Sequence, residues 1–133
     1  MDKKPFVTLE QLREIEKTYP TPFYIYDERG IRENAARLKQ AFSWNRGYKE
    51  YFAVKATPNP FLLNILKDMG CGTDCSSMTE LMMSRACGFS GSDIMFSSND
   101  TPPEEFAYAE KLGAIINLDD ITHIQCLEET LGH

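Results

Sequence analysis

Short strand-like segments that end at a regular interval are the feature of this sequence that most restricts its fold. The segments end near Val54, Cys75, Phe96 and Asn117, which are 21 residues apart. Each segment is followed by an amphipathic stretch with helical spacing. Strands that alternate with helices form a parallel sheet through right-handed crossovers, so the sequence predicts an α/β fold. The predicted strands are residues 48–56, 71–75, 93–97 and 114–118.

Helix-start signals follow each of these segments, where a βα unit requires them. The capping residues are Asn59, Ser77, Thr101 and Asp120. Two of them match the capping-box pattern, in which a glutamate three residues later bonds back to the cap. Glycines stand where three of the helices should end, and these are Gly70, Gly88 and Gly113. The sequence therefore predicts four consecutive βα units.

The first 30 residues have a different pattern. A capping-box sequence at Thr8 predicts a helix, which Pro20 ends. Residues 23–26 have the aromatic and β-branched composition of a strand. A turn that includes Gly30 should follow, and apolar residues with helical spacing predict another helix from Ile31.

The length of the chain leaves two architectures open. Four βα units are half of a closed eight-unit barrel, and such barrels commonly need ~250 residues. The 133 residues therefore fit either a small open α/β sheet or the first half of a larger enzyme. Periodicity does not distinguish the two.

Charge and composition argue against several classes of protein. A net charge of −6 argues against a nucleic-acid partner, because binding phosphates requires clustered Lys and Arg. No apolar run approaches the ~20 residues that span a bilayer, and the N-terminus lacks the apolar core of a signal peptide, so we expect a cytoplasmic protein with no membrane partner. The four cysteines contain no C-x-x-C pair, so we expect no metal site.

Lys55 stands at the end of the first predicted strand. Apolar neighbours disfavour an ammonium ion, so the pKa of a lysine there should be depressed, and a neutral amine is what Schiff-base chemistry requires. The alternative is a structural lysine whose stem packs on the strand while its ammonium group reaches solvent. Ligands of parallel α/β folds bind at the carboxyl ends of the strands, where Asp74 and Asn117 also stand. The pattern therefore favours a site for an amine-linked cofactor.

Four motifs resemble the N-terminal part of the fold-type III pyridoxal-phosphate decarboxylases. They are Thr21-Pro-Phe-Tyr-Ile-Tyr-Asp27, Tyr51-Phe-Ala-Val-Lys-Ala56, Gly72-Thr-Asp-Cys-Ser-Ser-Met-Thr-Glu-Leu81 and, more weakly, Ile116-Asn-Leu-Asp119. The second is similar to the motif whose lysine forms a Schiff base with the cofactor, and the third is similar to the family pattern Gly-x-Asp-x-x-Ser-x-x-Glu-Leu. The resemblance extends from about residue 20 to residue 127.

The resemblance implies a fold, a domain organisation and a cofactor. Residues 31–133 would be the first four βα units of a partial (β/α)8 TIM barrel that binds the cofactor. Residues 1–30 would supply a helix and a strand associated with a C-terminal β domain. Lys55 would be the catalytic lysine that holds pyridoxal 5′-phosphate, and Asp74 would lie near the cofactor.

Within that family the sequence is most similar to the diaminopimelate decarboxylases, which implies conversion of meso-diaminopimelate to L-lysine and CO2 in lysine biosynthesis. Ornithine or arginine decarboxylases, and a non-catalytic homologue that binds the cofactor, are the alternatives. Alanine racemases carry Ala-Asn-Ala-Tyr-Gly-His after the lysine, and Ala56-Thr-Pro-Asn-Pro60 departs from that pattern. The family implies a homodimer. Its remaining catalytic groups lie downstream or on the partner subunit, so we expect the 133 residues alone to be inactive.

Other polar residues in these motifs have simpler explanations. The capping box accounts for Ser77 and Glu80. Asn99 departs from the family pattern, because Ser98 replaces a glycine and no lysine follows. Asn117 is equally a rim residue of the site or an ordinary amide at a strand end.

Overall fold

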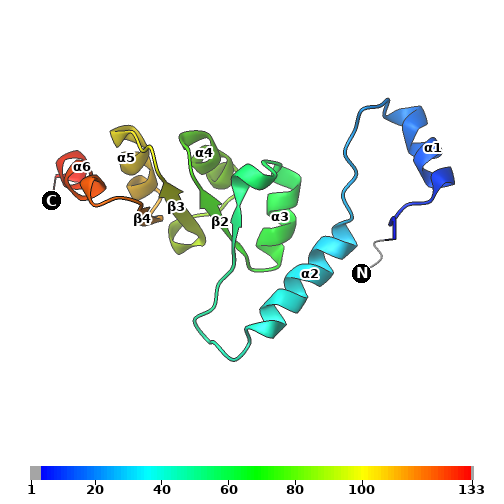
Figure 1. Ribbon diagram of the computed structural model, residues 1–133, viewed down its shortest axis with the longest axis horizontal. Helices are drawn as coiled ribbons and strands as arrows, with labels where there is room; N and C mark the ends of the chain where they lie inside the picture. Colours follow the sequence, from blue (N-terminus) through cyan, green and yellow to red (C-terminus); the bar gives the residue numbers. More distant parts are fainter. Residues whose placement is uncertain (1–3, 133) are drawn as a thin grey trace.

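A computed structural model describes residues 4–132, in which helices and strands alternate along most of the chain (Figure 1). The helices are α1 Leu9–Thr18, α2 Glu28–Ala41, α3 Pro60–Asp68, α4 Met78–Ala86, α5 Pro103–Lys111 and α6 Thr122–Leu131. The strands are β1 Tyr51–Ala53, β2 Gly72–Cys75, β3 Ile94–Ser98 and β4 Ile115–Leu118, and two 3-10 turns are η1 Val54–Ala56 and η2 Gly91–Asp93. Within residues 4–132, none of the helices has the length and apolar character needed to cross a bilayer.

The four strands form one parallel sheet in the order β1-β2-β3-β4. This confirms the predicted succession of βα units. The first strand is shorter than the predicted segment of residues 48–56, because the chain enters the turn η1 immediately after Ala53. The other three strands lie within one residue of their predicted bounds.

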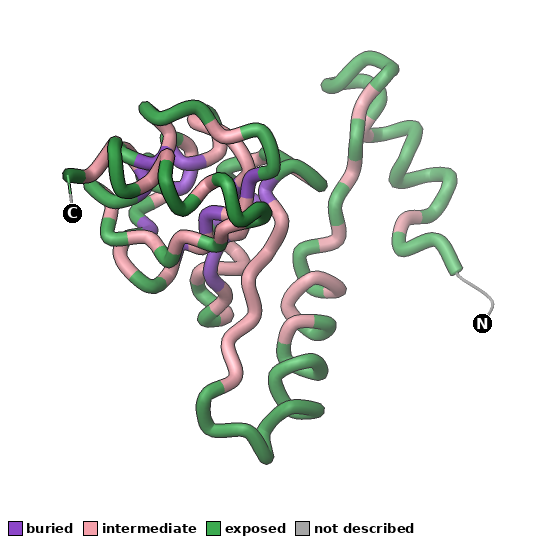
Figure 2. Tube along the Cα trace, turned by 60° about the vertical axis from the view of Figure 1, so that its left-hand side comes forward, coloured by how far each residue is buried: buried purple, intermediate pink, exposed green. Residues whose placement is uncertain are grey.

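The helices that follow the strands cover one face of the sheet, where the hydrophobic core lies. In β3 the burial alternates, with Ile94 and Phe96 fully buried and the residues between them less so. The core is made by buried side chains of the strands, of α3, α4 and α5, and of the loops between them: Val54, Leu63, Cys75, Leu81, Phe89, Ile94, Phe96, Phe106 and Ala109. Figure 2 shows the buried positions confined to this part of the molecule. The other face of the sheet has no covering layer among the described residues.

Most of the predicted helix starts and ends are confirmed. The side chain of Asn59 accepts a hydrogen bond from the backbone N–H of Phe61 (2.9 Å) and caps α3. Helix α6 begins one residue later than predicted, with Ile121 as its N-cap, although the Asp120 carboxylate accepts a hydrogen bond from the N–H of Thr122 (2.8 Å). At its end, α3 is followed by Gly70, which has a φ of +83°. A residue with a Cβ rarely adopts that conformation, so glycine allows the chain to turn back toward the sheet.

The predicted capping box at Thr101 is wrong. Helix α5 is preceded by Pro102 as its N-cap, and the Thr101 hydroxyl oxygen is buried without a hydrogen-bond partner. The two prolines, Pro102 and Pro103, determine this start because their fixed φ favours the first turn of a helix and needs no N–H partner.

Two predictions for the N-terminal region are also wrong. Residues 23–26 are not a strand, because a strand is defined by hydrogen bonds to a neighbour and no described segment pairs with them. Helix α2 begins at Glu28, three residues before the predicted start, so Gly30 lies inside the helix and Asp27 precedes it. Figure 1 shows α1 and the segment after it extending away from the sheet.

Gly72 lies where two strands and a turn approach closely. A Cβ on Gly72 would lie 2.6 Å from the carbonyl oxygen of Asp93 and 2.6 Å from the Tyr51 ring. We therefore expect Gly72→Ala to lower the free energy of unfolding of the intact protein by about 1–3 kcal/mol through overpacking. Urea-induced unfolding followed by circular dichroism measures this. Gly47→Ala is the control, because its nearest neighbour is 3.6 Å away, and an equal effect at both positions would contradict the prediction.

Candidate functional site

A row of side chains crosses the open face of the sheet. The register pairs Ala53 with Asp74, Asp74 with Met95, and Met95 with Ile115. Paired residues of parallel strands point to the same face, so Asp74 is the one charged member of an otherwise apolar row. Two residues further along β3 lies Ser97, whose hydroxyl accepts a hydrogen bond from the amide of Asn117 (3.1 Å). The carboxyl-terminal half of this face is therefore its polar half.

Lys55 lies in η1, immediately beyond the end of β1. Its neighbour Val54 is fully buried in the core, whereas Lys55 itself is exposed. The expectation that apolar neighbours shield Lys55 from solvent is therefore wrong for the described residues. Two features of the fold explain the exposure: β1 is an edge strand, and the open face of the sheet has no second layer.

Asp74 is the residue of the site with the most perturbed environment. Burial raises the pKa of the Asp74 carboxyl above its ordinary value, the positive charge of Lys55 opposes this, and the negative charge of Glu80 adds to it. One carboxyl oxygen of Asp74, Oδ1, is buried and has no hydrogen-bond partner. The structure thus places Lys55 just beyond the end of β1 and Asp74 on the adjacent strand β2, where the charge of Lys55 acts on the carboxyl, and one carboxyl oxygen of Asp74 remains without a hydrogen-bond partner.

The turn between β2 and α4 follows Asp74 directly. The Ser77 hydroxyl accepts a hydrogen bond from the N–H of Glu80 (3.4 Å), which confirms Ser77 as the N-cap of α4. The reciprocal bond of the predicted capping box is displaced by one residue, because the Glu80 carboxylate accepts from the N–H of Ser76 (3.0 Å). The N–H of Met78 is bound by a residue that the sequence did not reveal, Glu105 of α5 (2.9 Å). An acidic residue in the first turn of a helix is common, so nothing in the sequence indicated that Glu105 reaches a neighbouring helix.

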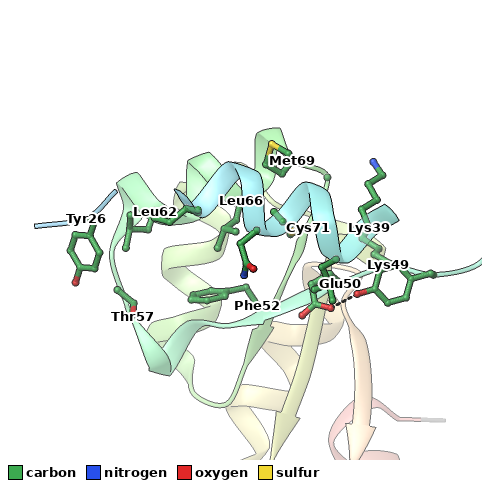
Figure 3. Close-up of a pocket in the computed structure, with 16 residues that line it drawn as sticks. Tyr26, Lys39, Lys49, Glu50, Phe52, Thr57, Leu62, Leu66, Met69 and Cys71 are labelled. Atoms are coloured by element: carbon green, nitrogen blue, oxygen red, sulfur yellow. Dashed lines mark hydrogen bonds between the residues drawn. The ribbon is translucent and has the colours of Figure 1, made fainter. Parts of the chain in front are cut away.

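A cavity of about 360 Å³ lies elsewhere, between α2, α3 and the segment that leads into β1. Figure 3 shows Phe52, Leu62 and Leu66 around it, and its lining contains neither Lys55 nor Asp74. At one end of the cavity the Tyr48 hydroxyl donates to the Glu50 carboxylate (2.6 Å), which raises the pKa of Tyr48 to about 12. The cavity is on the helix-covered side of β1, so it is separate from the lysine–carboxylate site.

The environment of Asp74 predicts how stability depends on pH. Its raised pKa means that the folded chain binds the carboxyl proton more tightly than the unfolded chain does. The contribution of Asp74 to stability is therefore full below its unfolded pKa and is lost as the pH rises through the folded pKa. We expect Asp74→Asn, which cannot ionise, to raise the free energy of unfolding at neutral pH and to change it little below about pH 4. Urea unfolding at both pH values measures this.

A control for that experiment is Asp100→Asn, because Asp100 is exposed. As a surface substitution, it should change the free energy of unfolding by no more than about 0.5 kcal/mol. An Asp74→Asn variant that is less stable than the parent at neutral pH would show that the ionised carboxylate stabilises the fold.

Comparisons with known proteins agree with this geometry. Residues 28–132 match the sequence profile of the pyridoxal binding domain of the pyridoxal-dependent decarboxylases. The match begins at the first residue of α2 and includes the whole parallel sheet. It therefore covers both Lys55 and Asp74.

Individual relatives point to the same family. Protein TabA of Pseudomonas amygdali pv. tabaci is 46% identical over 109 residues, which are 82% of this chain and 26% of that protein. Diaminopimelate decarboxylase of Methanothermobacter thermautotrophicus is 33% identical over 117 residues, which are 87% of this chain and 27% of that protein.

Among solved structures, diaminopimelate decarboxylase of Helicobacter pylori complexed with L-lysine superposes with a TM-score of 0.81 at 28% sequence identity, covering 91% of this chain and 31% of that one. The chain thus spans about a quarter to a third of the length of the relatives it matches. Its four-stranded sheet corresponds to the N-terminal part of their barrel. The chain belongs to the pyridoxal-dependent decarboxylases, with residues 28–132 matching their pyridoxal binding domain.

Proposed function

We propose that this chain supplies the cofactor-binding lysine of a pyridoxal-phosphate-dependent amino-acid decarboxylase that acts on meso-diaminopimelate and releases L-lysine and CO2. The observation that carries the proposal is the placement of Lys55 just beyond the end of β1, two residues after Ala53, which pairs with Asp74 on the adjacent parallel strand β2. The charge of Lys55 acts on the Asp74 carboxyl there. In such folds ligands bind at that end of the sheet.

The residues present fit the cofactor. Lys55 offers an exposed primary amine with no hydrogen-bond partner among the described residues, and an amine is the group that bonds covalently to the cofactor aldehyde. Asp74 offers a buried carboxyl oxygen that is still free to accept a hydrogen bond. The chemistry that bound pyridoxal phosphate supplies is an electron sink for the bond pair left by the departing carboxylate.

Each of the two side chains has a distinct role in this proposal. Lys55 would hold the cofactor through its amine and would accept or return a proton at its own nitrogen. Asp74 stabilises positive charge on that nitrogen, because a carboxylate close to a cation favours its charged form. The fully buried neighbours of Asp74 in β2, Thr73 and Cys75, keep water from the helix side of the strand.

The described residues do not supply an obvious phosphate site. The start of a helix often binds phosphate through free backbone N–H groups. At the start of α4, however, the N–H groups of Ser76 and Met78 are already bound by the carboxylates of Glu80 and Glu105. Two negative charges there would repel a phosphate group, so we assign phosphate binding to another part of the intact protein.

The choice of substrate follows from the names of the relatives. Relatives at 33% and 29% identity are diaminopimelate decarboxylases from different organisms. The relative at 46% identity carries no activity in its name. A second candidate function is therefore a homologue that binds pyridoxal phosphate and acts on a different amino acid, ornithine and arginine included, or on none.

One experiment tests the proposal and separates these alternatives. The intact protein is incubated with pyridoxal phosphate, reduced with borohydride, digested and mapped by mass spectrometry. The proposal expects a pyridoxyl adduct on Lys55 and release of CO2 from meso-diaminopimelate in preference to ornithine or arginine. An adduct on Lys55 without CO2 release from any of the three would support the non-catalytic homologue. The absence of an adduct on Lys55 would contradict both functions.

The proposal extends to the organisation of the intact protein. Residues 1–30 would associate with a C-terminal β domain, and residues 31–133 would form the N-terminal half of the cofactor-binding barrel, although residues 1–3 and 133 lie outside the described part. The absence of any buried residue in α1 and the exposure of Tyr24 (89%) support this, because such a segment needs another surface to cover it. A homodimer in the cytoplasm completes the proposal, and the mass of the intact protein in solution tests the dimer.

A further inference from the structure

The start of α4 is held by carboxylates from two different helices. Glu80, in the first turn of α4, accepts a hydrogen bond from the N–H of Ser76 (3.0 Å). Glu105, in the first turn of α5, accepts one from the N–H of Met78 (2.9 Å). Ser77 caps the same turn from within. The neighbouring βα unit therefore contributes directly to the turn that follows Asp74.

The position of Glu105 is specific. It lies in the first turn of α5, which packs beside α4, and its side chain is partly buried, whereas its neighbour Glu104 is exposed. The first N–H groups of a helix lack partners within the helix, and the dipole of the helix attracts negative charge to that end. Glu105 lies outside α4 and supplies the start of that helix with both a hydrogen-bond acceptor and a negative charge.

This turn follows β2, the strand that carries Asp74. Oδ1 of Asp74 has no hydrogen-bond partner, so this side-chain atom does not anchor the residue. Its position relative to Lys55 depends on the backbone on either side. The ladder of β2 pairs Asp74 and Cys75 with neighbouring strands, and Cys75 is also anchored by a contact between its sulfur and the Ser84 hydroxyl (3.2 Å). Beyond Cys75, the bonds made by Glu80 and Glu105 fix the remaining turn.

We propose that Glu105 is a positioning residue for the lysine–carboxylate site, acting through the N–H of Met78 and the turn of residues 76–77 to hold Asp74 beside Lys55. This inference rests on the proposed function, because it concerns the geometry that the cofactor would meet. It adds a residue from the third βα unit to a site whose two central side chains come from the first two.

The test compares three variants of the intact protein. Glu105→Ala removes the hydrogen-bond acceptor, Glu105→Gln retains an acceptor oxygen without the charge, and Glu104→Ala is the matched control on the adjacent, exposed glutamate. The quantity measured is the concentration of pyridoxal phosphate that labels half of Lys55 after borohydride reduction. It is determined well below the unfolding midpoint of each variant, which circular dichroism supplies.

Glu105→Ala is expected to raise the half-labelling concentration about fivefold, the factor that loss of a helix cap typically produces in an equilibrium constant. Glu105→Gln and Glu104→Ala should stay within about twofold of the parent, because Gln keeps an acceptor oxygen and the Glu104 side chain makes no hydrogen bond or ion pair within residues 4–132. If Glu105→Ala does not fold, Glu105→Asp, whose carboxylate is one methylene shorter, replaces it with the same expectation.

The outcomes distinguish this inference from the proposed function. If Glu105→Ala lowers the unfolding midpoint but labels Lys55 at the same concentration as the parent, Glu105 is only a structural cap and the inference is overturned. If the parent protein itself is not labelled at Lys55, the proposed function fails.

Discussion

Replacing Lys55 by arginine in the intact protein is expected to abolish the borohydride-stable adduct and to lower the rate of decarboxylation by about a thousandfold or more, the effect typical of removing a group that takes part in the chemistry. Arginine retains the positive charge that Asp74 experiences. Its guanidinium group stays protonated at any practical pH, however, and cannot bond to an aldehyde as a neutral amine does. The expected loss is therefore one of covalent chemistry and not of charge.

A matched substitution separates this effect from a general effect of lysine removal. Lys39 is exposed on α2 and makes no hydrogen bond or ion pair within residues 4–132, so Lys39→Arg should retain labelling and turnover. Mass spectrometry of the reduced protein and a CO2-release assay measure both variants. A Lys55→Arg protein that still decarboxylates its substrate at the parent rate would disprove the role of Lys55.

Truncating Phe106 to alanine is expected to lower the free energy of unfolding by about 3–5 kcal/mol, as deletion of a buried aromatic ring generally does. Phe106 is 1% exposed and lies edge-to-face against Phe96, with ring centroids 6.1 Å apart, and against His123, at 5.8 Å. It thus joins β3, α5 and α6 in one cluster. Since proteins have net stabilities of about 5–15 kcal/mol, this one substitution should remove a large part of the total.

Phe61 provides the control for that measurement, because it is 81% exposed on α3. Phe61→Ala should change the free energy of unfolding by no more than about 0.5 kcal/mol. Both values come from urea unfolding curves of the intact protein. Equal effects of the two substitutions would mean that Phe106 does not carry the packing described above.

The parts of the fold that were predictable from sequence are those determined by local chemistry. Asn59 and Pro60 determine the start of α3 with their own side chains, and Gly70 ends the following turn through its own backbone freedom. Such signals need no knowledge of the rest of the chain. The order of the sheet followed because alternating strands and helices allow few connections.

The predictions that were wrong depend on distant partners or on competing local signals. Residues 23–26 have the composition of a strand, yet composition does not provide the neighbouring strand that would bond to them. Thr101 matches a capping pattern, but the two prolines after it start α5 one residue later. The exposure of Lys55 depends on whether a second layer covers the sheet, which the ten residues around the lysine do not encode.

In the candidate site, too, some residues could be predicted from the sequence and another could not. Lys55 and Asp74 were predicted to lie at one edge of the sheet because the carboxyl ends of parallel strands share an edge, and in the structure Asp74 pairs with Ala53, two residues before Lys55. Their role as site residues remains a prediction. Glu105 was missed because its partner, the N–H of Met78, is 27 residues earlier and on another helix.

The placement of Asp74 between Thr73 and Cys75 has a consequence for how the protein folds. Successive residues of a strand point to opposite sides, so a misalignment of β2 by one position would turn this carboxylate toward Ile94 and Phe96 and bring two core residues into water. Burying a charge among apolar rings is costly, so a misaligned sheet is unstable from the outset. For this protein, the register of β2 that buries the core residues is also the register that places Asp74 on the open face of the sheet.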